Sequence, residues 1–354
     1  MPGLDEASIL DALRVVMDPD LHRDIVSLGF VRDVRVCDGN VAFAIELTTP
    51  ACPVKDQLKS QAEHVVSALP GVARVQVTMT AKVTASRPVL GTKGLIPGVK
   101  NVLAVSSGKG GVGKSTVAVN LACALQRTGA RVGILDADVY GPNVPLMLGV
   151  TGNPGETMVG GEKRIAPLRA HDLAVMSIGV MIKEDQPVIW RGPMLHSAMR
   201  SFLFEVHWGE LDYLVVDLPP GTGDAQLSLA QQAHVTGAVI VTTPQDVAVL
   251  DVRKAIRMFQ TVQVPILGVV ENMAYFVPPG SDQRYEIFGR GGGAKIEVEF
   301  GVPLLGQVPI DLAVREGGDH GRPVVVAHPD SAAARALIDV AGRVAARIST
   351  VNAT

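Results

Sequence analysis

The sequence predicts an α/β protein, with a mostly parallel, doubly wound sheet preceded by a small α+β unit. Three observations lead to this prediction. From residue 101 onward, short apolar runs alternate with segments of helical composition, a pattern typical of parallel sheets. A glycine-rich segment joins the first of these runs to a helical segment. Residues 1–82 instead carry helix and strand patterns in the order α-β-β-α-β.

The composition indicates a sizeable core and no surface for nucleic acid. Of the 354 residues, 47% are apolar and 19% are charged, which suits one large and one small domain. Aromatic residues make up 4% and the net charge is −3, so neither base stacking nor a basic binding face is indicated. No apolar stretch is long enough to span a bilayer, and the N-terminus lacks a signal-peptide pattern. We therefore expect a cytoplasmic protein that binds neither nucleic acid nor membrane.

The first unit is predicted to contain two helices and three strands. Apolar residues at helical spacing predict a helix over residues 5–17, with Asp5 as its N-cap. Strands are expected over 31–37 and 41–47 around an Asp-Gly-Asn turn. A second helix over 54–69 and a third strand over 72–83 complete the unit.

Cys52 is the residue of chemical interest in this unit. It precedes Pro53, which suits the first position of a helix, so Cys52 is expected at or near the N-cap. The helix dipole there predicts a lowered thiol pKa. The alternative is a small, half-buried residue without chemistry. Cys37 and Cys123 are expected to be packing residues, and three cysteines without a C-x-x-C pair predict no disulfide framework.

Residues 83–100 are predicted to link the two domains. The stretch from Thr84 to Lys100 is rich in proline and glycine and has little periodicity, which is typical of a linker. The second domain then covers residues 101–354. The prolines and glycines of the linker are Pro88, Gly91, Gly94, Pro97 and Gly98.

The glycine-rich segment fits the phosphate-loop pattern G-x-x-x-x-G-K-[ST]. It lies between a buried strand predicted over 101–105 and a helix predicted over 117–126. Glycines let backbone N–H groups surround an anion, and the helix N-terminus adds partial positive charge. Lys114 can then neutralise the β- and γ-phosphates, and the Ser115 hydroxyl can reach Mg²⁺. The alternative is a tight turn that binds nothing. The predicted nucleotide-binding residues of the loop are Gly108, Lys109, Gly110, Gly111, Val112, Gly113, Lys114, Ser115 and Thr116.

Lys109 is a second lysine that the phosphate-loop pattern does not require. It is either a solvated cation or a group that reaches phosphates in a facing subunit, like an arginine finger supplied in trans. With this lysine, the loop resembles that of the deviant Walker A ATPases, K-G-G-x-G-K-[ST]. This family includes the nitrogenase iron protein, the Min and Par partitioning ATPases and the Mrp/ApbC iron–sulfur carriers. Their nucleotide-sandwich dimers imply a homodimer here, with Lys109 and Lys114 as catalytic residues.

Two acidic motifs follow further predicted strands. The strand over 131–135 leads into D-A-D-V-Y-G-P, and the strand over 211–216 leads into Asp217 and then L-P-P-G-T-G-D. Carboxylates at the carboxyl ends of parallel strands can bind Mg²⁺ or orient water, whereas helix capping is the alternative. The resemblance implies that Asp138 orients the attacking water with support from Asp136, and that residues 218–224 form switch II. The expected Mg²⁺ site comprises Ser115, Asp138 and Asp217.

The end of the strand predicted over 266–270 favours adenine as the base. Asn272 offers a hydrogen-bond donor and an acceptor to the adenine edge, and the guanine-specific N-K-x-D pattern is absent, so ATP is favoured over GTP. Residues 307–311 resemble the family's second base-flanking segment, which implies contacts from Pro309 and Asp311. The last helix, over 331–348, is expected to pack against the sheet.

The whole chain most closely resembles the Mrp/ApbC carriers. Residues 1–82 resemble the MIP18-like domain through the Asp18-Pro19 stretch and T-P-x-C-P, in which Cys52 is that domain's characteristic cysteine. The W-R-G-P-M segment at 190–194 also matches these carriers. The resemblance implies an ATPase that transfers iron–sulfur clusters to apoproteins and works with iron–sulfur assembly proteins.

One departure from that pattern bears on the cargo. Mrp/ApbC proteins carry C-x-x-C just after the segment that reads N-M-A-Y-F here, at 272–276, and two such pairs can ligate one cluster across a dimer. Both cysteines are missing, which leaves Cys52 as the remaining thiol candidate. The alternative function is therefore a nucleotide-switched adaptor in iron–sulfur assembly that holds no cluster itself. A partitioning ATPase acting on membrane or DNA is a third hypothesis, which the acidic charge balance disfavours.

Overall fold

A computed structural model of the chain describes residues 4–86, 94–180 and 192–353. The chain divides into two compact units, one of Met1–Thr84 with Ala345–Thr354 and one of Ala85–Val344. None of the helices in the described ranges combines the length and apolarity that a bilayer crossing requires. Residues 190 and 191 of the W-R-G-P-M segment, and residues 87–93 of the linker, lie outside the described residues.

The first unit is a three-stranded sheet with two helices. Strands β3 and β4 are antiparallel, and β5 runs parallel to β4 after a crossover through α2, which follows the predicted order. The short antiparallel pair β1–β2, between α1 and β3, was not predicted. Asp5 caps α1 as predicted, because its side chain accepts from Ser8 N–H while the Ser8 hydroxyl accepts from Asp5 N–H. The elements are α1 (Glu6–Leu13), β1 (Met17–Asp18), β2 (Arg23–Asp24), β3 (Val31–Cys37), β4 (Asn40–Leu47), α2 (Lys55–Ser67) and β5 (Arg74–Ala81).

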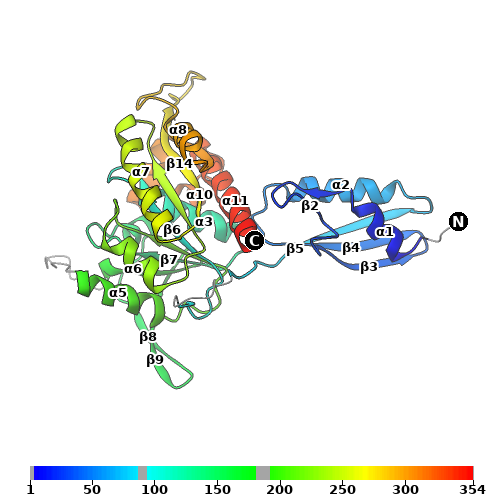
Figure 1. Cartoon of the computed structure of the whole chain (residues 1–354), viewed down its shortest axis with the longest axis horizontal. Helices are drawn as coiled ribbons and strands as arrows, with labels where there is room; N and C mark the ends of the chain where they lie inside the picture. Colours follow the sequence, from blue (N-terminus) through cyan, green and yellow to red (C-terminus); the bar gives the residue numbers. More distant parts are fainter. Residues whose placement is uncertain (1–3, 87–93, 181–191, 354) are drawn as a thin grey trace. The chain divides into compact units, whose positions relative to one another are not determined.

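The second unit is an eight-stranded sheet in the order β10-β11-β7-β12-β6-β13-β14-β15. All neighbours are parallel except β10 and β11, which confirms the predicted mostly parallel sheet. Helices α6 and α7 lie on one face and α3 and α10 on the other (Figure 1). The strands of this unit are β6 (Val102–Ser107), β7 (Val132–Asp136), β8 (Gly155–Val159), β9 (Glu162–Ala166), β10 (Leu168–Ala170), β11 (Leu173–Ser177), β12 (Tyr213–Asp217), β13 (Gly237–Thr242), β14 (Ile266–Phe276) and β15 (Leu304–Ile310).

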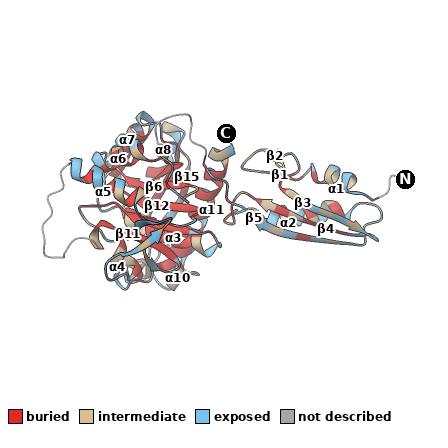
Figure 2. Cartoon of the chain, turned by 90° about the horizontal axis from the view of Figure 1, so that it is seen from below, coloured by how far each residue is buried: buried red, intermediate tan, exposed pale blue. Residues whose placement is uncertain are grey.

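The central strands form the core of this unit. Every residue of β6, β7, β12 and β13 is buried, because helices cover both faces of a parallel sheet (Figure 2). The last helix packs on β15 as expected, since Arg343 donates to the Leu305 carbonyl at 3.0 Å. The helices are α3 (Lys114–Arg127), α4 (Val144–Leu148), α5 (Gly192–Phe204), α6 (Asp224–Gln232), α7 (Asp246–Thr261), α8 (Gly292–Phe300), α9 (Leu312–Asp319), α10 (Val324–Ala327) and α11 (Ala332–Ala353).

Several parts of the second unit differ from the predicted elements, and strands β10, β11 and β15 were not predicted. Strand β14 continues beyond the predicted end at Val270, because Glu271 and Asn272 keep pairing with β15. Asn272 therefore lies inside a strand. The antiparallel hairpin β8–β9 was not predicted; its residues are exposed or half-buried, so the segment lacks the apolar run that marks a core strand.

Candidate nucleotide-binding site

Three adjacent parallel strands bring the predicted motifs to one edge of the sheet. In the order β7-β12-β6, the strands end at Asp136, Asp217 and Ser107, and Asp136 and Asp217 are partners in register. The phosphate loop follows β6 and leads into α3. Because parallel strands end at the same edge, motifs that lie about 30 to 110 residues apart in sequence share one site there.

The phosphate loop has the backbone geometry that anion binding requires. Gly111 and Gly113 both have φ of +80°, a conformation that side chains with a Cβ rarely adopt. A Cβ on Gly108 would lie 2.3 Å from the backbone carbon of Asp251 in α7, so only glycine fits. Gly113 is the N-cap of α3 and supplies no side-chain hydrogen bond, so the first N–H groups of the helix have no side-chain cap and can face a phosphate.

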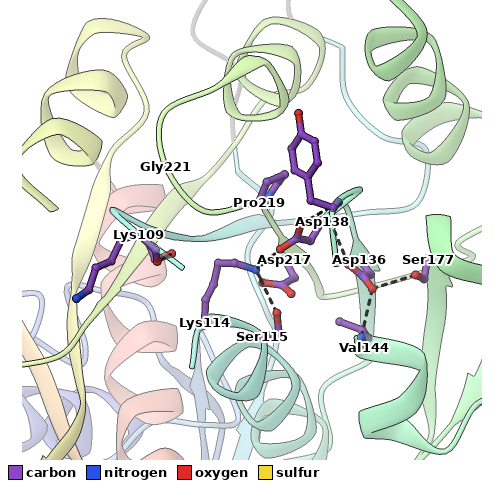
Figure 3. Close-up of polar contacts among 12 residues, drawn as sticks. Lys109, Lys114, Ser115, Asp136, Asp138, Val144, Ser177, Asp217, Pro219 and Gly221 are labelled. Atoms are coloured by element: carbon purple, nitrogen blue, oxygen red, sulfur yellow. Dashed lines mark hydrogen bonds and ion pairs between the residues drawn. The ribbon is translucent and has the colours of Figure 1, made fainter. Parts of the chain in front are cut away.

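Lys114 lies between two carboxylates (Figure 3). Its Nζ is 2.6 Å from Asp217 Oδ1, 3.5 Å from Asp138 Oδ2 and 3.2 Å from Ser115 Oγ. The side chains of Lys114 and Asp217 are only 6% and 0% exposed, so each requires the other as a counter-charge. The residues predicted to bind phosphate and Mg²⁺ are thus in mutual contact.

The donor set at Asp217 fits a Mg²⁺ ion. Asp217 Oδ2 is buried and has no hydrogen-bond partner among the described residues. Burial raises the pKa of Asp217, and hydrogen bonds from Lys114 and Ser115 oppose that rise. A carboxylate oxygen without a partner beside a serine hydroxyl provides the hard oxygen ligands that Mg²⁺ prefers.

Asp136 shapes the loop that presents Asp138. Its Oδ2 accepts from Ser177 Oγ at 2.9 Å and from Val144 N–H at 3.2 Å, while its Oδ1 accepts from Asp138 N–H at 3.1 Å. Asp138 is left with an oxygen toward Lys114. This geometry agrees with the supporting role predicted for Asp136.

The ionisation of Asp136 is expected to make the stability of the protein depend on pH. Burial, with the nearby Asp217 charge, raises the pKa of Asp136 from 3.8 to about 8. Between these two pH values Asp136 therefore keeps its proton in the folded state but loses it in the unfolded state. The contribution of Asp136 to stability is complete below the unfolded pKa and is lost as pH rises through the folded pKa. Between about pH 4 and pH 8 the free energy of unfolding should fall by up to about 1.4 kcal/mol per pH unit. Urea unfolding of wild type and Asp136→Asn across this range measures the slope, which should be shallower in the variant.

Asp212→Asn is the control for that measurement. Burial alone would raise the pKa of Asp212, but hydrogen bonds from Lys100 and Arg131 outweigh it and lower the pKa. Its contribution is therefore lost only as pH falls below the unfolded value of 3.8. Asp212→Asn should keep the wild-type slope between pH 5 and pH 8. An Asp136→Asn protein with that same slope would contradict the assignment.

Lys109 does not join the cluster around Lys114. Its side chain points away from Lys114, and none of the ion pairs among the described residues includes it (Figure 3). Its backbone is held, because the Ser107 hydroxyl donates to the Lys109 carbonyl at 2.9 Å. The position of the Lys109 ammonium, directed away from Lys114, is compatible with the predicted contact to phosphates in a facing subunit.

The residues predicted to contact the base have defined partners within the chain. Asn272 Nδ2 donates to the Val112 carbonyl at 2.9 Å, which ties β14 to the phosphate loop. Asp311 is the N-cap of α9, with its side chain accepting from Ala313 N–H, and Pro309 lies in β15. Contacts of these residues with a base stay predictions.

Glu271 is a site residue that sequence reasoning missed. It is 0% exposed, and its carboxylate accepts from Gly293 N–H and from Gln307 Nε2, each at 2.6 Å. These bonds fix the middle of β14, where Asn272 lies, to α8 and β15. A glutamate directly after an apolar strand run was the available signal, because an acid is rarely buried there without a partner.

Cys52 differs from its prediction. The N-cap of α2 is Val54, so Cys52 lies two residues before the cap position. Burial raises the pKa of Cys52 to about 11. A hydrogen bond with the Val54 backbone opposes this rise more weakly, and the negative charges of Asp18 and Asp20 add to it. The predicted lowering of its pKa is therefore wrong, because burial and two acids outweigh a helix end that lies too far along the chain.

The other cysteines and the segment after β14 also bear on metal binding. Cys123 is buried as expected, whereas Cys37 is exposed, so its packing role is wrong. Within the described ranges, no group of three or more His, Cys, Asp or Glu is arranged to hold a metal ion. In the segment that lacks the family's C-x-x-C, Phe276 and Tyr285 exchange two backbone hydrogen bonds and Arg284 stacks 4.3 Å from the Tyr275 ring centre.

The arrangement has counterparts among known proteins. Residues 98–345 match the family described as NUBPL iron-transfer P-loop NTPase, and residues 6–78 match the family described as Iron-sulfur cluster assembly protein. Proteins named "Iron-sulfur cluster carrier protein" from Synechocystis sp. and Deinococcus radiodurans are each 51% identical to this chain. Each match covers 97% of this chain, and it covers 97% of the Synechocystis protein and 95% of the Deinococcus protein. A solved nucleotide-binding protein of Archaeoglobus fulgidus, in complex with ADP, is 38% identical with a TM-score of 0.58, covering 67% of this chain and 91% of that one.

Proposed function

Because the chain belongs to the NUBPL iron-transfer P-loop NTPase family, we propose that it hydrolyses ATP and carries iron–sulfur clusters to apoproteins. The observation that carries the ATPase part is the contact of Lys114 with Asp217 and Asp138 at the head of α3. The carrier part is supported by the names of relatives that match over nearly the whole chain. We further propose a homodimer that works with iron–sulfur assembly proteins.

The geometry supports a division of labour among the site residues. Backbone N–H groups of the loop and the Lys114 ammonium bind the β- and γ-phosphates, so Lys114 exchanges Asp217 for the nucleotide. Ser115 and Asp217 are the ligands for Mg²⁺, which when bound neutralises charge on the phosphate oxygens. The Asp138 carboxylate accepts a hydrogen bond from the attacking water and orients it toward the γ-phosphorus. Lys109 of the second subunit completes the charge around the phosphates.

This chain offers few ligands for the iron–sulfur cluster that a carrier would bind. Four thiolates normally hold one [4Fe–4S] cluster, whereas Cys52 is the single half-buried thiol of the first unit and is protonated near pH 7. A cluster on Cys52 would need thiolates from a second subunit or a small thiol. The adaptor without a cluster is the second candidate function, and the thiol-free turn closed by Arg284 and Tyr275 favours it.

Anaerobic reconstitution distinguishes the carrier from the adaptor. If the protein is a carrier, the wild type incubated with ferrous iron, sulfide and glutathione should retain iron and sulfide. The Cys52→Ser variant should lose most of both. Because ligation must displace the Cys52 proton, uptake should rise with pH between about 7 and 9. The measurement is iron and sulfide assay with visible absorbance after desalting.

Cys37→Ser is the matched control, since it removes an exposed thiol from the same unit and should load like wild type. Negligible iron on wild type, under conditions that load a relative with C-x-x-C, would reject the carrier and leave the adaptor.

A further inference from the structure

Helix α6 connects switch II to the predicted linker, whose residues from 85 onward belong to the second unit. Switch II, residues 218–224, leads directly into the first turn of α6, which begins at Asp224. The other end of α6, at Gln232, meets the described part of the linker. Two segments of different function are therefore attached to the two ends of one short helix.

Gln226 holds switch II from the first turn of α6. Its Nε2 donates to the Pro219 carbonyl at 2.6 Å and to the Gly221 carbonyl at 3.0 Å. Gly221, which has φ of +93°, in turn donates its N–H to the Ser107 carbonyl at 2.8 Å. The same Ser107 bonds the Lys109 carbonyl through its hydroxyl. One run of hydrogen bonds thus joins α6, switch II and the phosphate loop.

The amide of Gln226 is only partly satisfied. The residue is 1% exposed, and its Oε1 has no hydrogen-bond partner among the described residues. A buried acceptor without a partner costs about 1 to 3 kcal/mol, so this arrangement of switch II has a built-in penalty. A displaced loop that offers a backbone N–H to Oε1 would remove the penalty. Removal of this penalty would thus favour a second arrangement of switch II, which a coupling element requires.

The far end of α6 binds the linker through backbone hydrogen bonds. Gly94 N–H donates to the Gln232 carbonyl at 3.0 Å, and His234 N–H donates to the Gly94 carbonyl at 3.1 Å. A Cβ on Gly94 would lie 3.1 Å from the Phe204 ring, so the linker approaches closely. Ser86 Oγ and His234 Nε2 are 2.8 Å apart, which adds a second attachment. The linker therefore contacts the C-terminal end of α6 and the residues just after it at more than one point.

We propose that Gln226 is a positioning residue through which the nucleotide, acting on switch II, moves α6 and changes the seating of the linker at Gly94. This inference rests on the proposed function, because it requires nucleotide binding at the phosphate loop. The γ-phosphate draws switch II from its bonds with Gln226, and the helix carries the displacement to Gln232 and His234. The protein thereby reports its nucleotide state to the linker that leads to the first unit.

Hydrogen exchange on the full chain tests the first half of the relay. With Mg²⁺ and a non-hydrolysable ATP analogue, exchange in wild-type peptides that cover residues 94–100 and 228–236 should change by at least about fivefold. Gln226→Met keeps the size of the side chain but removes its donors and its unpaired oxygen. This variant should still bind the analogue and should lose the nucleotide-dependent change. Gln231→Met, five positions along the same helix and exposed, should behave like wild type.

Gly94→Ala tests the relay from the other end and does not depend on the folding of the first variant. Its Cβ would lie 3.1 Å from the Phe204 ring, so either the ring or the linker must shift, and because coupling between sites is reciprocal, affinity for the ATP analogue should change by at least about fivefold. Unchanged affinity in Gly94→Ala, or a nucleotide-dependent change that persists in Gln226→Met, would overturn the relay. Failure of wild type to bind the analogue would instead refute the proposed function itself.

Discussion

Replacing Lys114 by methionine is expected to abolish ATP turnover and to destabilise the fold. The ammonium is the only charged group in direct contact with both Asp217 and Asp138 among the described residues, so kcat/KM should fall by at least about 10³. Asp217, fully buried, also loses its counter-charge, which should lower the free energy of unfolding by about 3 kcal/mol. Steady-state hydrolysis and calorimetric titration with Mg–ATP measure the first effect, and urea unfolding measures the second.

Lys100→Met is the control for this substitution. Lys100 makes a 2.8 Å ion pair with Asp212 and stands just before β6, at the strand end opposite the phosphate loop. Its loss should lower stability while leaving ATP affinity close to that of wild type. A Lys114→Met protein that still binds Mg–ATP with wild-type affinity would refute the site.

Replacing Lys109 by alanine is expected to lower kcat by about 10³ with little effect on Mg–ATP affinity at its own site. The reason is geometric, because this ammonium points away from Lys114 and acts only where a second subunit's phosphates lie (Figure 3). Hydrolysis rates as a function of protein concentration, together with direct titration of nucleotide, separate the two quantities. A Lys109→Ala protein that hydrolyses ATP and dimerises like wild type would exclude the role in trans.

Mixing two inactive variants gives a sharper test of that role. Lys109→Ala retains Asp138, and Asp138→Ala retains Lys109, so a mixed dimer contains one complete site. Because half of the dimers in an equal mixture are mixed, activity should recover to about a quarter of wild type. If Lys109 acts within its own chain, the mixture should stay inactive.

Much of the nucleotide site could be predicted because its parts are local. The phosphate loop needs glycines at positions of positive φ, and Gly111 and Gly113 take that conformation. Asp136 and Asp217 follow uninterrupted apolar runs, and parallel strands that end at one edge must bring them together. The fold class and the family were predicted on the same grounds and are confirmed by the parallel sheet and by the match over residues 98–345.

Features that depend on packing at a distance could not be predicted. The pKa of Cys52 depends on how deeply the thiol is buried and on Asp18 and Asp20, which the T-P-x-C-P motif does not report. Glu271 and Gln226 look like ordinary polar residues in the sequence, and only the structure places their side chains against backbone groups of other segments.

By itself, then, the sequence determined which residues form the phosphate loop, which acids follow the neighbouring strands and which cysteines are missing, because each follows from residue type and local order. Tertiary structure alone decided that the pKa of Cys52 is raised rather than lowered and that α6 is bonded both to switch II and to the linker. The physical reason is that burial and the pairing of buried polar groups are set by neighbours that are remote in the chain.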